Sequence, residues 1–233
     1  MLNHVLYQDD DIVVLKKESG DHVHPPEDKR VRVQWNRILI YRVQDFLKKK
    51  VFPVHRLDVP TMGILIMALN KESANLLCQQ FSGNNVLKKY KAVVRGYVKS
   101  CGEIDLPLEL DSTGEPVGAF TQYQCLKTVE LNYAVSDKHK SSRYSLVEVT
   151  PKTGRYHQIR RHFNRISHPL IGDCEHGDSR HNRFFREQLN ISGLCLMAHE
   201  ITFQHPKSKL QMQFKIEDDE KWKIINKLFD YYI

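Results

Sequence analysis

The chain has 233 residues, and its 35 Lys and Arg outnumber its 28 Asp and Glu, which gives a formal net charge of +7. Hydrophobic residues make up 41% of the chain, enough to build a core and too many for a disordered protein. The longest apolar run, residues 63–69, is far shorter than the ~20 residues of a membrane-spanning helix. The start of the chain also lacks a signal-peptide pattern. We therefore expect one domain over residues 1–233, a cytoplasmic location and no contact with a membrane.

The cysteines are odd in number and widely spaced, and none forms a Cys-x-x-Cys pair. This pattern argues against a disulfide framework or a thiolate zinc site and is typical of a reducing compartment. The five are Cys78, Cys101, Cys125, Cys174 and Cys195.

The first part of the chain predicts a strand at residues 12–15, a turn at 16–20 and a second strand at 63–69. A helix is predicted between these strands, where four apolar residues fall near helical spacing: Trp35, Leu39, Val43 and Phe46. Asn70 is an expected N-cap for a further helix. One side of that helix carries Ala74, Leu77, Cys78 and Phe81.

Further strands are predicted at residues 90–95, 118–125, 143–149 and 200–205. The spacing of Tyr156, Ile159, Phe163 and Ile166 predicts an amphipathic helix with these four side chains buried. A final helix follows three acidic residues and carries Trp222, Ile225, Leu228 and Phe229. Residues 167–193 predict a long functional loop or a disordered one. Short strands with few helices and no regular alternation indicate an α+β fold with a largely antiparallel sheet.

Positive charge is concentrated in residues 149–168, which contain no acidic residue. The basic residues and histidines of this stretch are Lys152, Arg155, His157, Arg160, Arg161, His162, Arg165 and His168. A solvated helix face is one explanation, and contact with phosphate groups is the one that we favour. His157 and His162 are five residues apart, a spacing that does not suit two metal ligands on one helix face. We therefore expect structural or RNA-contacting roles for them and no metal.

Two groups of residues could carry chemistry. Residues 55–63 place Asp58 among turn residues just before an apolar strand, where functional side chains often occur. From these residues alone, catalysis by Asp58 is no better supported than a structural role, in which Asp58 caps a turn or pairs with Arg56. Residues 153–162 could direct one arginine to a carboxylate, which would keep that carboxylate ionised, or form ordinary surface ion pairs. No nucleotide-binding or serine-nucleophile motif occurs, so we expect no cofactor.

These segments resemble the RluA-type pseudouridine synthases. The resemblance rests on His55-Arg56-Leu57-Asp58 with Thr61-x-Gly63, on Lys89-Tyr90-Lys91 with Gly96, on Gly154-Arg155-x-His157-Gln158-Ile159-Arg160-x-His162, and on His168-Pro169-x-Ile171-Gly172-Asp173. Lys17-x-Ser19-Gly20 near the start also agrees. The sequence departs from the family pattern at Glu18, Met62 and Met197. The motifs cover nearly the whole chain in the family's order, with no room for a separate N-terminal RNA-binding domain.

The resemblance implies that Asp58 is the catalytic nucleophile, that Arg160 pairs with it and that Tyr90 stacks on the target uracil. Whether Asp58 attacks ribose C1′ or the base, or acts through a glycal, stays open. Further substrate-binding residues are expected to be His55, Arg56, Thr61, Arg155, His157, Ile159, Arg161 and Arg165. Ile159 could instead belong to the apolar stripe of its helix.

Within the family, the motif from Pro151 to His162 and the segment from Ser167 to Asp178 are most similar to enzymes that isomerise the uridine at tRNA position 65. We therefore expect a tRNA substrate, no obligatory protein partner and a monomer. Ribosomal RNA is the alternative substrate. A non-catalytic RNA-binding protein on the same scaffold is an alternative of another class, although it would be expected to lack the catalytic carboxylate.

Overall fold

The computed structural model describes residues 5–26, 28, 30, 32–110, 113–136 and 139–231. The chain forms two compact units. Unit 1 comprises Met1–Lys88 and Ala198–Ile216, and unit 2 comprises Lys89–Met197 and Glu217–Ile233.

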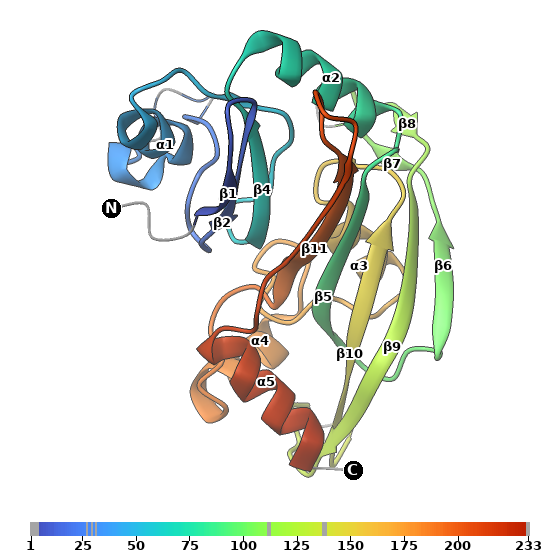
Figure 1. Ribbon diagram of the computed structural model, residues 1–233. Helices are drawn as coiled ribbons and strands as arrows, with labels where there is room; N and C mark the ends of the chain where they lie inside the picture. Colours follow the sequence, from blue (N-terminus) through green and yellow to red (C-terminus); the bar gives the residue numbers. More distant parts are fainter. Residues whose placement is uncertain are drawn as a thin grey trace. The chain divides into compact units, whose positions relative to one another are not determined.

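Unit 1 contains a sheet in which the strands neighbour one another in the order β1-β2-β4-β11 (Figure 1), with β12 paired to β11 and β3 to β4. The pairs β1–β2, β2–β4, β3–β4 and β11–β12 are antiparallel. Its strands are β1 (Val5–Gln8), β2 (Ile12–Lys17), β3 (Phe52–Pro53), β4 (Met62–Ala68), β11 (Leu196–Gln204, which starts in unit 2) and β12 (Gln211–Lys215). All seven residues of β4 are buried, which suits a strand covered on both faces. The predicted strands at 12–15 and 63–69 are confirmed.

The helices of unit 1 are the 3₁₀ helix η1 (Trp35–Arg37), α1 (Leu39–Leu47) and α2 (Lys71–Ser82). The predicted cap is confirmed, because Oδ1 of Asn70 accepts a hydrogen bond from the Ser73 amide at 2.8 Å. Part of the predicted apolar pattern is wrong. Leu39 and Val43 are buried in α1, and Leu77 is buried in α2. Three other members of the predicted stripes are exposed: Trp35, Phe46 and Cys78.

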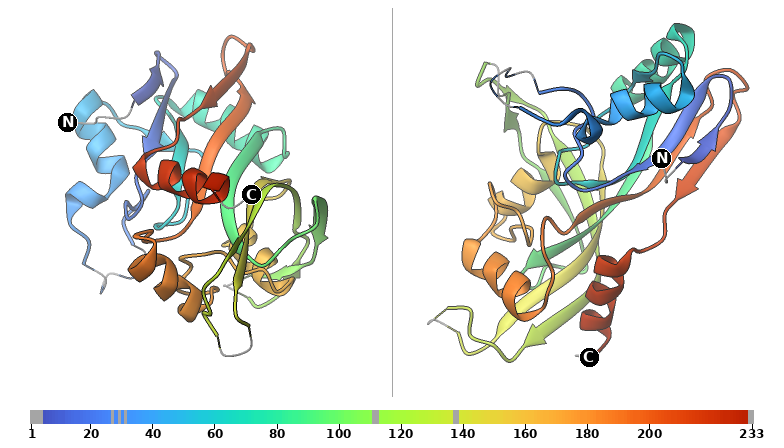
Figure 2. Two further views of the ribbon diagram at one scale, coloured as in Figure 1. Left: turned by 90° about the horizontal axis from the view of Figure 1, so that it is seen from below. Right: turned by 90° about the vertical axis from the view of Figure 1, so that its left-hand side faces the viewer.

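Unit 2 contains a second run of antiparallel strands, in the order β5-β10-β9-β6, and a short β7-β8 hairpin. The strands are β5 (Leu87–Arg95, which starts in unit 1), β6 (Cys101–Asp105), β7 (Leu108–Glu109), β8 (Pro116–Val117), β9 (Phe120–Leu131) and β10 (Ser142–Pro151). The register of β9 against β10 shifts at Leu126, because Leu146 pairs with Lys127 and Val147 with Cys125. The hairpin that joins β9 to β10 extends from one end of this unit (Figure 2).

The helices of unit 2 are α3 (Gln158–Arg165), α4 (Ser179–Gln188) and α5 (Glu220–Tyr231). Ile159 and Phe163 of α3 pack on Ala92, Val94 and Val149 in the core. Tyr156 is exposed, contrary to the prediction, because α3 begins two residues after it.

Residues 167–193 were predicted as irregular, and this is wrong for the ten residues of α4. That helix is capped by Asp178, whose carboxylate accepts the Arg180 amide at 3.0 Å. The final helix is confirmed as α5. Asp219 caps this helix, because its carboxylate accepts a hydrogen bond from the Trp222 amide at 3.0 Å. Trp222, Ile225 and Phe229 are buried.

The structure confirms the predicted α+β class: the strand pairs are mainly antiparallel, and helices accompany the strands in each unit. Among the described residues, no helix is both long and apolar enough to cross a membrane.

Candidate active site

The loop that carries Asp58 is fixed to the segment that follows β2. Its backbone closes a tight turn, since the Asp58 carbonyl accepts the Thr61 amide at 3.0 Å. The ammonium group of Lys17 donates to the carbonyl groups of Glu18, Val59 and Thr61 at 3.0, 3.0 and 2.8 Å. We call residues 58–61 the Asp58 turn.

Two further bonds join the same segments. The hydroxyl of Ser19 donates to the Pro60 carbonyl at 2.9 Å, and the Gly20 amide donates to the Val59 carbonyl at 2.8 Å. Every carbonyl group from Asp58 to Thr61 therefore accepts a hydrogen bond, which restrains the backbone on both sides of the Asp58 side chain.

Lys17 is fully buried, and burial lowers its pKa to about 8, although the negative charges of Asp21 and Asp58 act in the opposite direction. A protonated amine has three hydrogens, which matches the three carbonyl groups around it. The protonation state of Lys17 is therefore linked to the conformation of the Asp58 turn.

Gly63, which follows the Asp58 turn, allows β4 to approach β11 closely. Its φ is +136°, and a Cβ at this position would lie 2.4 Å from the Ala198 carbonyl oxygen. Any other residue would force the two strands apart. This explains why the motif needs a glycine here, whereas the neighbouring departure, Met62, is simply a buried strand residue.

His55 holds the other end of the loop. Its Nε2 accepts the Ile66 amide at 3.0 Å, and its ring stacks on Phe81 with centroids 4.5 Å apart. Burial, with a smaller contribution from Lys88, lowers the pKa of His55 to about 3. His55 is thus a neutral imidazole that ties the loop to β4 and α2, and its predicted contact with substrate stays a prediction.

Two other residues predicted in this loop lie in different environments. Arg56 is exposed, and its charge, after the larger effect of burial, contributes to the lowered pKa of His24. Thr61 is buried, and its Oγ1 has no hydrogen-bond partner. Arg56 is therefore accessible to a ligand, whereas Thr61 acts through its backbone.

In unit 2, α3 carries Arg160 with a side chain only 2% exposed. Its Nε and Nη2 donate to the two carboxylate oxygens of Asp173 at 2.7 and 2.8 Å. Nη2 also donates to Oε1 of the exposed Glu175 at 3.0 Å. This two-pronged contact fixes both the position and the plane of the guanidinium group.

Asp173, the partner of Arg160, lies in one of the sequence motifs, but the sequence predicted no role for it. Burial alone would raise its pKa, but hydrogen bonds from Arg160 and from the amides of Glu175 and His176 outweigh this effect and keep the pKa below its usual value. Asn182 of α4 donates to the Asp173 carbonyl at 2.8 Å and accepts the Gly172 amide at 2.7 Å. The helix that sequence analysis missed thus holds the partner of Arg160 in place.

The start of α3 is fixed by Gln158, which is buried and fully hydrogen-bonded. Its Oε1 accepts from Thr153 and from the Arg155 amide at 2.7 and 3.0 Å, and its Nε2 donates to the Phe120 carbonyl and to Oγ1 of Thr121 at 3.0 and 2.9 Å. Gln158 therefore attaches the loop before α3 to strand β9.

The two histidines of the basic stretch have structural contacts. His162 lies 3.0 Å from both Oγ1 of Thr121 and the Leu106 carbonyl, and burial lowers its pKa, so it is neutral. His157 is buried with a left-handed backbone, stacks on Tyr156 and lies 3.0 Å from His176. The predicted structural role is confirmed for His162.

The remaining predicted arginines bind parts of the chain near the β7-β8 hairpin. Arg155 donates to the Gly118 carbonyl at 3.1 Å, and Arg161 to the Glu109 carbonyl at 2.9 Å. Arg165 donates to the Pro107 carbonyl, and its charge lies 3.9 Å from the Glu109 carboxylate. Their cationic groups are thus oriented by backbone carbonyls, and contact with phosphate stays a prediction.

Ile159 belongs to a core cluster of unit 2, and Tyr90 packs against the same cluster. Tyr90 of β5 is partly buried against it, and Ile159 is 6% exposed within it. The burial of Ile159 supports the helix-stripe alternative. Tyr90 retains an accessible part, as an aromatic platform for a base requires.

Two groups of possible metal ligands occur among the described residues. One is His157, Glu175 and His176; the other is Asp9, Asp11 and His205. In the second, Nδ1 of His205 accepts backbone amides and Nε2 lies 2.8 Å from Asp9, so its atoms are already satisfied. In the first, the Arg160 guanidinium contacts Glu175, and a cation there would be repelled. Neither group suits a metal ion.

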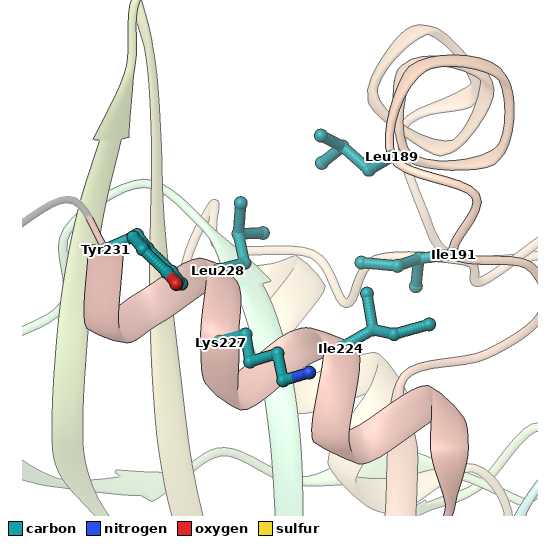
Figure 3. A pocket seen from close by; sticks show the side chains of 6 residues that line it. All are labelled: Leu189, Ile191, Ile224, Lys227, Leu228 and Tyr231. Carbon is teal, nitrogen blue, oxygen red and sulfur yellow. The ribbon is translucent and has the colours of Figure 1, made fainter.

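An apolar cavity of about 530 Å³ lies elsewhere in unit 2, between α5 and the segment after α4 (Figure 3). Leu189, Ile191, Ile224 and Leu228 line it, with Lys227 and Tyr231 at its border. It holds one cation and no carboxylate in its described lining, so it does not suit acid–base chemistry.

Comparison with known proteins identifies the family. Residues 11–165, well over half of the chain, match the family model described as RNA pseudouridylate synthase. The chain belongs to this family, with motifs of the RluA type. Two human structures, RNA Pseudouridylate Synthase Domain Containing 1 and 4, share the fold with a TM-score of 0.71 each, at 21% and 23% identity, over 97% of this chain and 94% and 92% of theirs.

Among the relatives are three proteins named tRNA pseudouridine synthase C. Those of Haemophilus ducreyi and Vibrio vulnificus are each 37% identical, over 98% and 97% of this chain and 96% and 95% of their own lengths. That of Pasteurella multocida is 38% identical, over 97% of this chain and 96% of its own. The similarity therefore spans nearly the full length of both partners.

Proposed function

We propose that this chain is a tRNA pseudouridine synthase that isomerises one uridine, at tRNA position 65. The observation that carries the proposal is the near full-length similarity to proteins named tRNA pseudouridine synthase C, together with an Asp58 turn whose backbone is restrained on both sides. The five free cysteines support a cytoplasmic location, and we expect a monomer.

The reaction breaks the bond between ribose C1′ and uracil N1, turns the base and joins C1′ to C5. A proton leaves C5 and N1 gains one, so substrate and product are isomers and no oxidant or reductant is consumed. Asp58 supplies the carboxylate that reacts with the nucleotide, and its restrained backbone limits the directions that its side chain can take.

Arg160 is proposed to pair with Asp58. Support comes from its burial and from the carboxylate of Asp173, which fixes the guanidinium plane. A cation beside Asp58 would keep that carboxylate ionised and ready to react.

Tyr90 is proposed to stack on the uracil once the nucleotide has left its helix. Turning a base out of the stack costs a few kcal/mol, and stacking on an aromatic ring returns about 1–3 kcal/mol. The partly exposed ring of Tyr90, supported by the core from behind, suits this role.

The test uses purified protein, an unmodified tRNA transcript and ribosomal RNA, with pseudouridine located by mass spectrometry. We expect one pseudouridine at tRNA position 65. In Asp58→Asn we expect product formation to fall below detection while tRNA affinity stays within about twofold, because the two side chains have nearly the same shape. Modification of ribosomal RNA alone would refute the tRNA assignment, and undiminished turnover in Asp58→Asn would refute the nucleophile.

A further inference from the structure

A second cavity of unit 2, of about 510 Å³, has a strongly cationic lining. It lies between the end of β5, the β9–β10 hairpin and the start of α4. Its charged and titratable residues are Arg95, His139, Lys140, Arg143, Arg180 and His181, and serine residues of the hairpin complete the polar wall. We call it the cationic cavity; none of these residues belongs to the motifs of the candidate active site.

No carboxylate belongs to the described lining of the cationic cavity. The carboxylates nearby hold the arginines instead. Asp178 lies 2.7 Å from Arg95 and 3.6 Å from Arg180, and Glu130 lies 3.2 Å from Arg143. The cavity thus has four cationic side chains against these two carboxylates, which leaves a net positive charge for a ligand. The four are Arg95, Lys140, Arg143 and Arg180.

Two of the arginines, Arg95 and Arg143, are held in place before any ligand binds. The guanidinium of Arg143 lies over the ring of Tyr97, 5.2 Å from its centroid, and Arg95 also donates to the Ser167 carbonyl at 3.3 Å. Because these side chains are already ordered, less conformational entropy is lost when an anion binds. Guanidinium groups and hydroxyls are the groups that most often contact backbone phosphates.

We propose that the cationic cavity binds phosphate groups of the RNA backbone away from the nucleotide that is isomerised; this inference rests on the proposed function. Arg95 and Tyr90 are five residues apart on β5, which corresponds to about 17 Å along a strand, and an odd spacing places their side chains on opposite faces. The cavity is thus too far from Tyr90 to hold the target uridine itself, and phosphates bound there would belong to other nucleotides and would contribute affinity without the reading of a base.

The experiment measures the affinity of an unmodified tRNA transcript by fluorescence anisotropy over a series of salt concentrations. The variants are Lys140→Gln, Arg143→Gln and the pair together. The matched control is Lys223→Gln, which removes an exposed cation of unit 2 that, like Arg143, is held by a single carboxylate, here Glu220 at 2.8 Å. Thermal unfolding of each variant checks that the fold is intact.

We expect each single substitution to weaken binding about threefold at low salt. The slope of log affinity against log salt should fall by about one for Lys140→Gln and by less than one for Arg143→Gln, whose charge Glu130 partly neutralises. The double variant should lose about tenfold, because two such contacts act nearly independently. Lys223→Gln should leave both quantities unchanged.

An unchanged slope in Lys140→Gln and Arg143→Gln, or an equal change in Lys223→Gln, would overturn the inference. Pseudouridine formation by the unaltered chain is measured alongside. If it forms product while the cavity variants bind tRNA normally, only the inference fails; if it forms none on any RNA, the proposed function fails independently of the cavity.

Discussion

The Asp58 turn and the Arg160 site hold their charged side chains by different means. The turn is restrained through its backbone carbonyls, mainly by one buried ammonium group, that of Lys17. Arg160 is restrained through its own guanidinium by the carboxylate of Asp173, which backbone amides hold in turn. The first arrangement restrains the backbone that carries the Asp58 side chain, whereas the second fixes the guanidinium group itself.

This difference predicts different failures. A buried ion pair that loses one partner leaves an uncompensated charge, so damage to the Arg160 site should appear in stability as well as in activity. Lys17 is a buried charge already, with a lowered pKa, so its removal also relieves an energetic cost. Damage to the Asp58 turn should therefore appear mainly in activity.

The largest effect is expected for Asp173→Asn. The neutral amide cannot balance the charge of Arg160, and the free energy of unfolding should fall by about 3–5 kcal/mol, as for other broken buried pairs. Urea denaturation measures this free energy, and the slope of the free energy against urea concentration is checked for each variant. The control is Glu175→Gln, which removes the exposed partner of the same guanidinium and should cost no more than about 1 kcal/mol. Equal losses in the two variants would contradict the comparison.

Lys17→Met is expected to have the next largest effect, on activity. Without the ammonium group the Asp58 turn loses two hydrogen bonds, those to the Val59 and Thr61 carbonyls, and the Glu18 carbonyl loses a third. The Val59 carbonyl keeps the Gly20 amide. A displacement of the reacting group by about 1 Å can cost about 100-fold in rate, and we expect a loss of this order. The free energy of unfolding should change by only about 1 kcal/mol, because the lost bonds offset the relieved burial of a charge.

The same residue gives a pH dependence of opposite sign in two measurements. The pKa of Lys17 is about 8 when folded and 10.5 ordinarily, so between these values the unfolded chain binds more protons and stability contributed by this group rises with pH. Activity should fall as the pH rises through about 8, where Lys17 of the folded protein loses its proton, because a neutral amine has two hydrogens for three carbonyls. In Lys17→Met both trends should disappear; a persisting fall in activity near pH 8 would assign it to another group.

The sequence predicted the elements whose apolar residues face one core. β4 and α5 have regular apolar patterns, and both were found within a residue or two. α4 was missed because its buried residues, Phe184 and Phe185, are adjacent rather than three or four apart, and the rest of the helix is polar. Its N-cap at Asp178 was the available signal.

The candidate site was predictable from motifs, but its restraints were not. Lys17 acts on carbonyls 42 and 44 residues away, and carbonyl groups have no signature in a sequence. Asp173 stood in a quoted motif, yet nothing in its spacing from Arg160 indicated a contact. The exposure of Tyr156 likewise depends on where α3 begins. The spacing of apolar residues does not fix the first residue of a helix, so it could not show that Tyr156 precedes α3.

The smallest effect concerns the exposed face of the helix that carries Arg160. Arg161 and Arg165 lie 4.0 and 3.9 Å from the Glu109 carboxylate, which is itself exposed. If these arginines contact phosphates, Glu109 competes with the RNA for them. Glu109→Gln should then raise tRNA affinity about twofold at low salt, because it removes a negative charge that repels the phosphates. Arg165→Gln should lower affinity and flatten the salt slope by less than one, because its charge is already partly neutralised.

Anisotropy titrations of both variants at two salt concentrations measure these changes. Glu175→Gln again serves as the control, since it removes an exposed carboxylate whose cation, Arg160, is buried and inaccessible to phosphate from solution. A rise in affinity for Glu109→Gln but not for Glu175→Gln would show that the two arginines beside Glu109 and the buried Arg160 have separate tasks. Equal rises would mean that RNA responds only to net charge, and Arg161 and Arg165 would then lose their assignment as phosphate contacts.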